Sequence, residues 1–366
     1  MAEAVDIDLA TTIVPPDHKL WKLFPGEAYK FMNFFAESKV VFLDVRGLEV
    51  LDGNPKNWDR NEVLEIVSLD RWSRQNEQRT DKTERRISDS DKRTATYVEG
   101  LLTKAKKGDF ILVPAPGPDG LVSVYELTSG PGAISKVDGQ DGRTFNTYIG
   151  RRVRWLGGVR KRALDYAVVE MLQTPVAFFD MGNAGRTTFY EEILGNYVHD
   201  SGMVATYRVA KEDYNSRDNR IASTWMEFVD LVSDQSALEA AIANASGASI
   251  YELLDAAFLT EAQRSDLSIN INSPGEILMR ALGLSPLIGL ALFPLAANGV
   301  PYEQALEAQV HIATLGGAVD DCTAQVQSSV KTILEAMGSD RWIKACELAQ
   351  KAQSAAEIST DSSIEN

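Results

Sequence analysis

Two segments decide the fold of the first half of the chain: KKGDFILVPAPGPDGLVSVYEL, residues 106–127, and RRVRWLGGVRKR, residues 151–162. A turn at Gly108-Asp109 leads into the apolar segment 110–114, which ends in the Pro- and Gly-rich run 114–120. Segment 121–127 alternates well enough for a second, half-buried strand, and 151–156 is predicted to be a third. Three short strands that each follow a turn predict a small β-barrel.

The third strand is basic, and segment 151–162 contains no acidic residue. Strand alternation places Val153 and Trp155 on one face and Arg152 and Arg154 on the other. A cationic edge that bears an aromatic ring is typical of a surface that binds polyanions, but solvated arginines on a barrel produce the same pattern. Periodicity alone leaves both interpretations open. Trp155 is the aromatic residue that we most expect to be simply buried.

The order of these features resembles the N-terminal domain found in front of Mrr-type restriction endonucleases, a member of the PUA/EVE group of small pseudo-barrels. Residues 20–48 are similar to the opening of that domain, with Trp21, Gly26, a helix around 29–37 and a strand over 40–45. The resemblance covers about residues 20–162 of the chain. The chain departs from the family in a charged insertion at 73–95 and at 125–127, where the family usually has a glycine.

The resemblance implies a domain that reads nucleic acid, including modified bases or nucleotides, in a prokaryotic restriction or antiviral defence system. A flipped base is held by stacking on aromatic rings, and basic side chains hold the flanking phosphates. Core packing is the competing interpretation for each aromatic residue. The stacking candidates are Trp21, Phe24, Trp72 and Tyr148, and the phosphate-binding candidates are Arg85, Arg86, Arg151, Arg152, Arg154, Arg160, Lys161 and Arg162.

Charge is unevenly distributed along the chain. The first 162 residues carry 26 basic and 24 acidic side chains, whereas the remaining 204 carry 11 and 28. Any nucleic acid should therefore bind to the first half, because the acidic second half would repel phosphate. The insertion at 73–95 is almost free of apolar residues and is expected to be a mobile loop or an exposed helix end. It is either a flap that grips phosphates or a solvated insertion.

The second half is dominated by helical periodicity. Helices are expected over 237–245, 250–257, 260–266, 302–315, 318–337 and 340–355, and another is expected to open at Ser273-Pro274. We therefore predict an α+β protein in which a PUA-like barrel with flanking helices precedes a mainly α-helical domain. The expected parts are a flexible lead-in (1–18), the barrel domain (19–175), a mixed connecting region (176–221), the helical domain (222–355) and a disordered acidic tail (356–366).

No targeting or membrane-spanning segment is evident in the sequence. The apolar run 284–300 is shorter than the roughly 20 residues needed to cross a bilayer, and it is interrupted by Pro and Gly. It is expected to be a buried helical hairpin, so no membrane contact is expected. Cys322 and Cys346 have no CxxC spacing and suggest neither a zinc site nor a disulfide framework, which favours the cytoplasm.

No catalytic constellation stands out, and no cofactor or metal is expected. The Lys that a Mrr-type nuclease requires is replaced by Thr128 in the Glu126-Leu127-Thr128 segment. Three functions remain open. The first is a nucleic-acid reader whose helical domain oligomerises or recruits a partner protein, and the second is a non-catalytic structural subunit of a defence complex. The third is an enzyme that uses the available carboxylates Asp180, Glu191, Glu192, Asp213 and Asp218.

Overall fold

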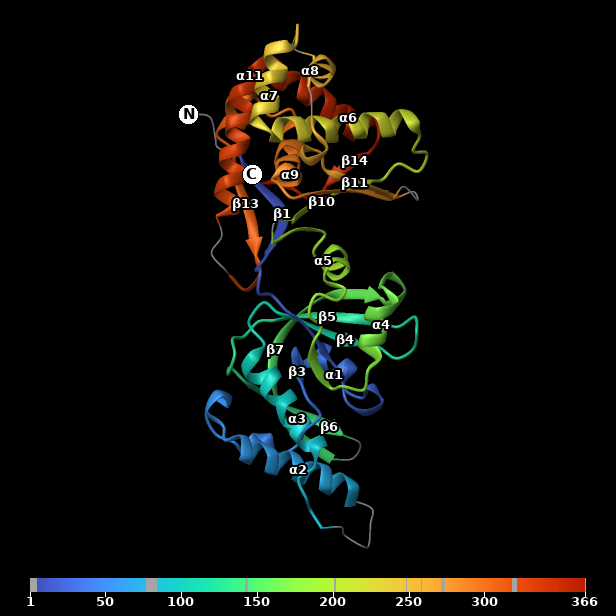
Figure 1. Ribbon diagram of the computed structural model, residues 1–366, viewed down its shortest axis with the longest axis vertical. Helices are drawn as coiled ribbons and strands as arrows, with labels where there is room; N and C mark the ends of the chain where they lie inside the picture. Colours follow the sequence, from blue (N-terminus) through green and yellow to red (C-terminus); the bar gives the residue numbers. More distant parts are fainter. Residues whose placement is uncertain are drawn as a thin grey trace. The chain divides into compact units, whose positions relative to one another are not determined.

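The protein is mixed α+β in the computed structural model, which describes residues 5–76, 84–141, 144–200, 202–247, 249–257, 259–270, 274–317 and 321–365. The chain divides into two compact units (Figure 1). Unit 1 combines Met1–Pro16 with Leu194–Asn366, and unit 2 is Asp17–Ile193. Unit 2 is thus inserted in the sequence of unit 1, which no composition shift in the sequence indicated.

Unit 2 contains a curled, half-barrel sheet with the strand order β3-β7-β5-β4-β2-β8, and β6 pairs with β7. The strands predicted over 110–114 and 121–127 are confirmed, whereas the predicted third strand is the middle of a much longer one. The bounds are β2 (Leu20–Leu23), β3 (Val40–Phe42), β4 (Phe110–Pro114), β5 (Leu121–Leu127), β6 (Ser135–Asp141), β7 (Thr144–Arg160) and β8 (Phe178–Asp180).

An apolar core joins one face of this sheet to the first helices of unit 2, and Phe35, Val63, Val98 and Leu101 are among its buried members. Helices α2 and α3 lie side by side (Figure 1). The helices are α1 (Met32–Ser38), α2 (Arg60–Asn76), α3 (Asp89–Glu99), the π-helical turn η4 (Gly100–Lys104), α4 (Tyr166–Gln173) and α5 (Arg186–Leu194). Short 3₁₀ turns are η1 (Glu27–Tyr29), η2 (Leu48–Val50), η3 (Pro55–Asn57) and η5 (Lys161–Ala163).

The charged insertion at 73–95 is more ordered at its ends than expected. Its first residues complete α2, and its last ones form the start of α3. Ser88 caps α3 in a reciprocal capping box with Asp91, and Arg71 binds the Asp91 carboxylate at 2.7 Å. Residues 77–83 lie outside the described part of the chain, so the proposed flap falls there only in part.

Unit 1 is an eight-stranded sheet with helices packed on one face. The strand order is β11-β12-β10-β9-β1-β13, with β14 paired to β10 and β15 to β1. The strands are β1 (Asp6–Val14), β9 (Asn196–His199), β10 (Gly202–Val209), β11 (Asp266–Asn270), β12 (Gly275–Ala281), β13 (Gln309–Thr314), β14 (Ile358–Thr360) and β15 (Ser363–Glu365). The helices are α6 (Ser216–Ser233), α7 (Gln235–Asn244), α8 (Ile250–Ala256), α9 (Ser285–Ala297), α10 (Tyr302–Leu306) and α11 (Cys322–Ala355), with 3₁₀ turns η6 (Glu261–Gln263) and η7 (Leu315–Gly317).

Several sequence-based expectations fail in unit 1. The segment 1–18 is not a loose lead-in, because its described part forms β1, in which Ile7 and Leu9 are fully buried. The acidic tail is not disordered, because β14 and β15 both pair within the sheet. Segment 176–221 is no connecting region, because it supplies β8 and α5 to one unit and β9 and β10 to the other. The region 222–355 is mainly helical, as expected, but it also contributes the three strands β11, β12 and β13, which were not expected.

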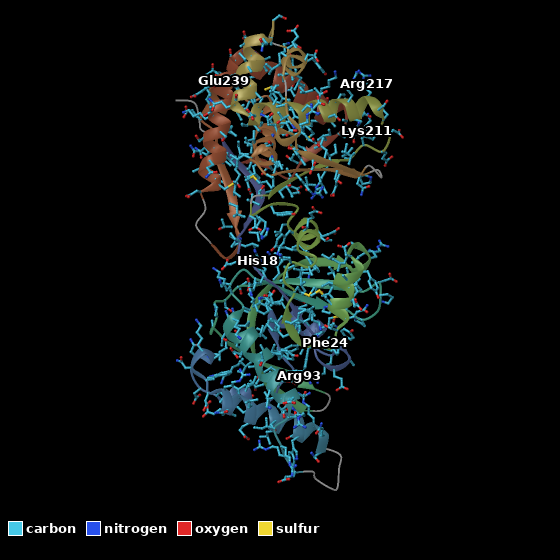
Figure 2. The ribbon with its side chains drawn as sticks, in the orientation of Figure 1. His18, Phe24, Arg93, Lys211, Arg217 and Glu239 are labelled. Atoms are coloured by element: carbon cyan, nitrogen blue, oxygen red, sulfur yellow. The ribbon has the colours of Figure 1, made fainter. Side chains whose placement is uncertain are left out.

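The apolar run near 284–300 is a single buried helix, α9, with every residue from Ser285 to Ala297 inside the core. It packs against α6, α11 and β10 (Figure 1). Among the described residues, no helix is long and apolar enough to cross a membrane. The start of α6 is fixed by Asn215, whose side chain accepts the Arg217 N–H, and by the Lys211–Asp218 ion pair at 2.8 Å; Lys211 and Arg217 are labelled in Figure 2.

Candidate nucleic-acid interface

Trp155 is the most unexpected residue of the sheet in unit 2, because 61% of its surface is exposed. The register of β5 against β7 shifts at this point: Tyr125 pairs with Trp155, but Val124 pairs with Gly157, which leaves Leu156 without a partner. This β-bulge bends the strand and re-aims its side chains. The expectation that Trp155 is buried is therefore wrong, since simple alternation cannot anticipate a bulge.

Beyond the bulge, the register places an aromatic ring and a guanidinium on the same face. Trp155 pairs with Tyr125, Gly158 with Ser123, and Arg160 with Leu121. Positions two apart on a strand share a face, so these pairs form one strip. Tyr125 is buried, whereas Leu121 and Arg160 are exposed, so the strip begins where the core ends. We call Trp155, Gly158, Arg160, Ser123 and Leu121 the Trp155 strip.

Gly158 leaves the strip without a side chain between Trp155 and Arg160 on β7. A Cβ at this position would lie 3.6 Å from the Leu121 Cδ2 atom and the Val122 carbonyl oxygen, so the Leu121 side chain lies beside the glycine. The spacing from Trp155 to Arg160 is roughly 15 Å at the rise of an extended strand. A chain of two or three extended nucleotides has a comparable reach, so the strip suits a base at one end and a phosphate at the other.

Four of the predicted phosphate-binding residues of this segment are exposed: Arg152, Arg154, Arg160 and Arg162. Arg154 is partly neutralised, since its Nη2 lies 2.5 Å from Oε2 of Glu126. Arg152 donates a long hydrogen bond of 3.3 Å to the Ser135 hydroxyl. Within the described part of the chain, Arg160 and Arg162 form no ion pair. Both can therefore bind phosphate without first breaking a salt bridge.

Arg151 and Lys161 do not belong to this surface, which corrects their assignment as phosphate-binding residues. Arg151 has no exposed surface, and its guanidinium donates to the carbonyl oxygens of Leu101 and Ala105 at 3.0 Å and to Ser129. Burial lowers the pKa of Arg151 to about 10. Lys161 is buried as well, and its ammonium donates to the carbonyl oxygens of Ala115 and Gly117. Both cations hold loops together.

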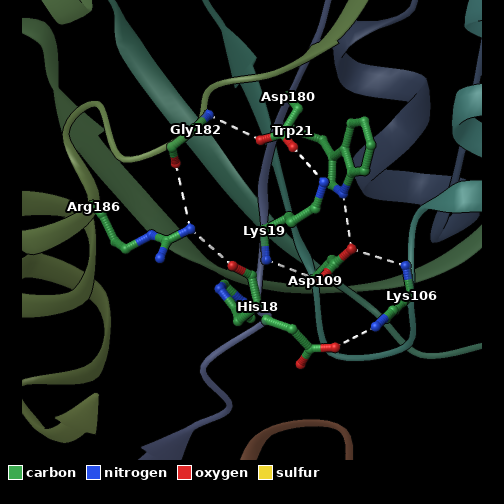
Figure 3. Close-up of polar contacts among 9 residues, drawn as sticks. His18, Lys19, Trp21, Lys106, Asp109, Asp180, Gly182 and Arg186 are labelled. Carbon is green, nitrogen blue, oxygen red and sulfur yellow. Dashed lines mark hydrogen bonds and ion pairs between the residues drawn. The ribbon is translucent and has the colours of Figure 1, made fainter. Parts of the chain in front are cut away.

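Trp21 and Tyr148 are core residues, so neither is available to stack on a base. The Trp21 ring stacks on Phe178 with centroids 5.0 Å apart, and its Nε1 donates to Asp109 at 2.8 Å (Figure 3). Asp109 also accepts the backbone N–H groups of Lys19 and Lys106. Tyr148 is fully buried and stacks on Phe42 at 4.5 Å.

Asp109 explains why the Gly108-Asp109 turn precedes β4. Its buried carboxylate collects three N–H donors and thereby joins the turn to β2 (Figure 3). Burial raises the pKa of Asp109, and the three hydrogen bonds oppose that shift. The turn that the sequence identified is therefore fixed by a polar network, and Trp21 serves that network.

The remaining aromatic and basic candidates lie outside the strip. Phe24, labelled in Figure 2, is half-buried beside Tyr29, with ring centroids 4.9 Å apart. Trp72 is half-buried on α2. Arg85 and Arg86 are ion-paired with Glu65 and Glu84, both at 2.7 Å. The structure thus brings neither these arginines nor these two rings to the Trp155 strip.

Two buried polar residues escaped the sequence analysis. The ammonium of Lys22 donates to the carbonyl oxygens of Thr174 and Val176 and lies 5.2 Å from the ring of Phe24; burial lowers its pKa to about 8. His18 contacts the hydroxyl of Tyr190 at 2.7 Å and the Gly108 carbonyl at 3.1 Å. The sequence contained two signals for these residues: a lysine within the apolar strand LWKL and a histidine shortly after two prolines.

The carboxylates considered for catalysis do not form one cluster. Asp180 lies in unit 2, where it pairs with Lys19 at 2.6 Å, and Asp218 lies in unit 1, where it pairs with Lys211. In the described ranges, no group of three or more His, Cys, Asp or Glu side chains could hold a metal ion. Cys322 and Cys346 are free and buried, and burial raises the pKa of Cys346 to about 11.

Comparison of the chain with known protein families, with characterised proteins and with solved structures found no match.

Proposed function

We propose that unit 2 is a PUA-like module that binds nucleic acid along the Trp155 strip. In this proposal a base stacks on the Trp155 ring, and Arg160, with Arg162 two residues further along the chain, holds the phosphates. The exposed indole between exposed arginines is the observation that carries the proposal. A side chain of this size normally buries most of its surface, so an exposed one favours a binding role.

The energies are of the right size for a binding site. Stacking of one base on an aromatic side chain contributes about 1–3 kcal/mol, and it tolerates any base because every base has a flat face. Each phosphate contact adds an electrostatic gain that falls with salt. One stacking residue and a few free arginines therefore favour moderate affinity for single-stranded nucleic acid. The Trp155 ring and the residues around it would set any preference among modified bases.

The wider setting of the proposal rests on the resemblance to PUA/EVE domains and on charge. The resemblance favours a role in prokaryotic antiviral defence. The acidic surplus after residue 162 favours contacts between unit 1 and a protein partner, or a second copy of the chain, over contacts with nucleic acid.

Binding of fluorescent oligonucleotides to the full chain tests this function. Trp155→Ala should weaken binding about tenfold, and the double variant Arg160→Gln/Arg162→Gln should reduce the salt slope for single strands by about 1.4. The matched control is Arg217→Gln/Arg220→Gln, which removes two exposed arginines from α6 in unit 1. Equal losses in the control, or full binding by Trp155→Ala, would exclude the strip as the binding surface.

A further inference from the structure

A separate cavity of about 480 Å³ opens in unit 2 between η3, the first turn of α2, the end of α3 and η4. This volume falls in the range of small-molecule sites, roughly 300–1,000 Å³. None of the residues that line it was selected from the sequence, and none belongs to the Trp155 strip. Its inner wall is apolar and is made by Val63, Ala95, Val98 and Leu102, all of them buried.

The indole of Trp58 forms part of the same lining. Trp58 is half-buried, and its Nε1 donates to the carbonyl oxygen of Asp52 at 3.0 Å. That hydrogen bond fixes the ring and occupies its polar atom, so the ring can offer the cavity only an aromatic surface. A fixed aromatic ring beside an aliphatic wall favours a flat, apolar ligand.

The rim of the cavity is cationic. Arg60 donates from Nη1 to Glu99 at 2.9 Å and from Nη2 to Thr96 at 3.0 Å, which orients its guanidinium. Glu99 also pairs with Lys104 at 3.0 Å, and the Lys104 hydrogen bond is the largest cause that lowers the pKa of Glu99. Lys56 lines the rim too and, within the described residues, forms no ion pair. Lys56 and Arg60 line the cavity, and Lys104 shares the Glu99 carboxylate with Arg60, so the charges at and beside the rim are three positive and one negative and favour an anionic group.

The part of the cavity wall that contains Leu102 has an unusual backbone. Helix α3 continues into the π-helical turn η4, which places Leu102 and Thr103 at the cavity. Such turns are rare and frequently occur at functional sites. The carbonyl groups freed at this helix end are satisfied by other parts of the unit: Arg151 binds those of Leu101 and Ala105, and the Gly132 N–H binds that of Leu102. The cavity wall is therefore preformed.

We propose that this cavity is a binding site for a small aromatic anion, with its ring against Trp58 and its carboxylate, sulfonate or phosphate group at Arg60 and Lys56. Arg151 is a positioning residue, since it acts on the site only through η4. This site does not depend on nucleic-acid binding by the Trp155 strip.

Titration of the full chain with 2-naphthalenesulfonate, followed by calorimetry, tests the site. The neutral 2-naphthalenesulfonamide has the same rings without the charge and serves as the matched ligand. The sulfonate should bind with a dissociation constant below about 1 mM, and the sulfonamide about tenfold more weakly. Arg60→Gln should weaken sulfonate binding about tenfold and leave sulfonamide binding unchanged. Trp58→Ala should abolish binding of both ligands, whereas Trp58→Phe should retain most of the binding of both.

Two further variants separate this site from other effects. Ala95→Leu should block binding by filling the cavity, while Trp155→Ala should leave it intact, because the strip lies elsewhere on unit 2. Circular dichroism confirms folding of each variant. The proposal is overturned if the sulfonate fails to bind by about 1 mM, if the sulfonamide binds equally well, or if folded Trp58→Ala and Arg60→Gln bind like the wild type. Loss of binding in Trp155→Ala would also overturn it.

Discussion

The guanidinium of Arg151 on β7 lies 3.0 Å from the carbonyl oxygen of Leu101, in the π-helical turn that ends α3. The same nitrogen donates to Ala105 at the same distance. A helix end leaves carbonyl groups without partners, and here a buried cation from a distant strand satisfies them. The most basic segment of the sequence therefore contributes to the interior of unit 2 as well as to its surface.

Replacement of Arg151 should destabilise unit 2 without changing the charge of its surface. Arg151→Met leaves the carbonyl groups of Leu101 and Ala105 buried and unpaired, which should lower the free energy of unfolding by about 3 kcal/mol. Arg151→Lys should not restore it, because one ammonium cannot reproduce the planar fork. Denaturant unfolding measures the loss, and amide exchange should rise first in residues 101–105. An unchanged exchange rate there would contradict the role.

Asp109→Asn should also destabilise unit 2. The Asp109 carboxylate accepts Lys19 N–H on one oxygen and both Trp21 Nε1–H and Lys106 N–H on the other. An asparagine side chain has only one acceptor oxygen, so it cannot accept at both positions. We expect a loss of about 2 kcal/mol, measured by denaturant unfolding. Trp21 fluorescence should report the change directly. Asp119→Asn, on the exposed turn before β5, is the control and should have no effect.

Lys22 should make the stability of unit 2 depend on alkaline pH. Its pKa is about 8 in the folded protein against 10.5 for the free side chain. Below pH 8 both states bind the proton, and the folded state carries the whole penalty of a buried charge. From pH 8 to 10.5 only the unfolded chain still binds it, so the free energy of unfolding rises with pH.

The rise should amount to about 3 kcal/mol relative to Lys22→Met, which cannot titrate. Unfolding by denaturant at several pH values across that window gives the difference between the two proteins. If that difference is constant with pH, the amine of Lys22 keeps its ordinary pKa.

Glu126→Gln should strengthen nucleic-acid binding if phosphates also reach the face of β7 that carries Arg152 and Arg154, opposite Trp155. Glu126 holds Arg154 at 2.5 Å, so its removal frees a guanidinium and deletes a negative charge. We expect a gain of about threefold to tenfold at low salt that fades at high salt. Glu239→Gln, on α7 and labelled in Figure 2, removes one exposed carboxylate from unit 1 and should change nothing. A gain of equal size in both variants would indicate a general charge effect.

Deletion of residues 358–366 should destabilise unit 1, although the composition of this segment is typical of a polar, disordered tail. Ile358 is fully buried, β14 pairs with β10, and β15 pairs with β1. Without them Ala356 and the edge of β1 become exposed, and we expect a loss of at least 2 kcal/mol. Thermal unfolding checks this. An unchanged transition would mean that the two short strands add nothing to the sheet.

The sequence predicted the local structure of unit 2 better than its long-range contacts. Turn chemistry and apolar runs identified β4 and β5 almost to the residue, because those signals act over a few positions. The bulge at Leu156 and the burial of Arg151 depend on partners from other parts of the chain. Charge alone therefore could not separate Arg151, which is internal, from Arg152, which is exposed.

Unit 1 was harder to predict because several of its strands, such as β11, β14 and β15, are short or largely polar. In β12 the buried residues Ile277 and Met279 alternate with exposed or half-buried ones, which is the period of two of a strand. The preceding Ser-Pro-Gly-Glu segment is typical of a helix start, so the sequence predicted a helix there. β13 follows α10 after a two-residue gap, whereas the sequence predicts one helix over the whole segment 302–315. Tertiary pairing decided both cases. The predicted helices 318–337 and 340–355 correspond to the two parts of α11, which are separated at Gly338 by a non-helical backbone with a positive φ; residues 318–320 lie outside the described part of the chain.

The insertion of unit 2 between β1 and β9 imposes an order on synthesis. β1 leaves the ribosome before unit 2, yet both of its parallel neighbours, β9 and β13, are encoded after the whole of unit 2. The apolar side chains of β1 must therefore remain exposed while unit 2 is synthesised and folds. A chaperone that shelters β1 would therefore be needed during the interval in which unit 2 is synthesised.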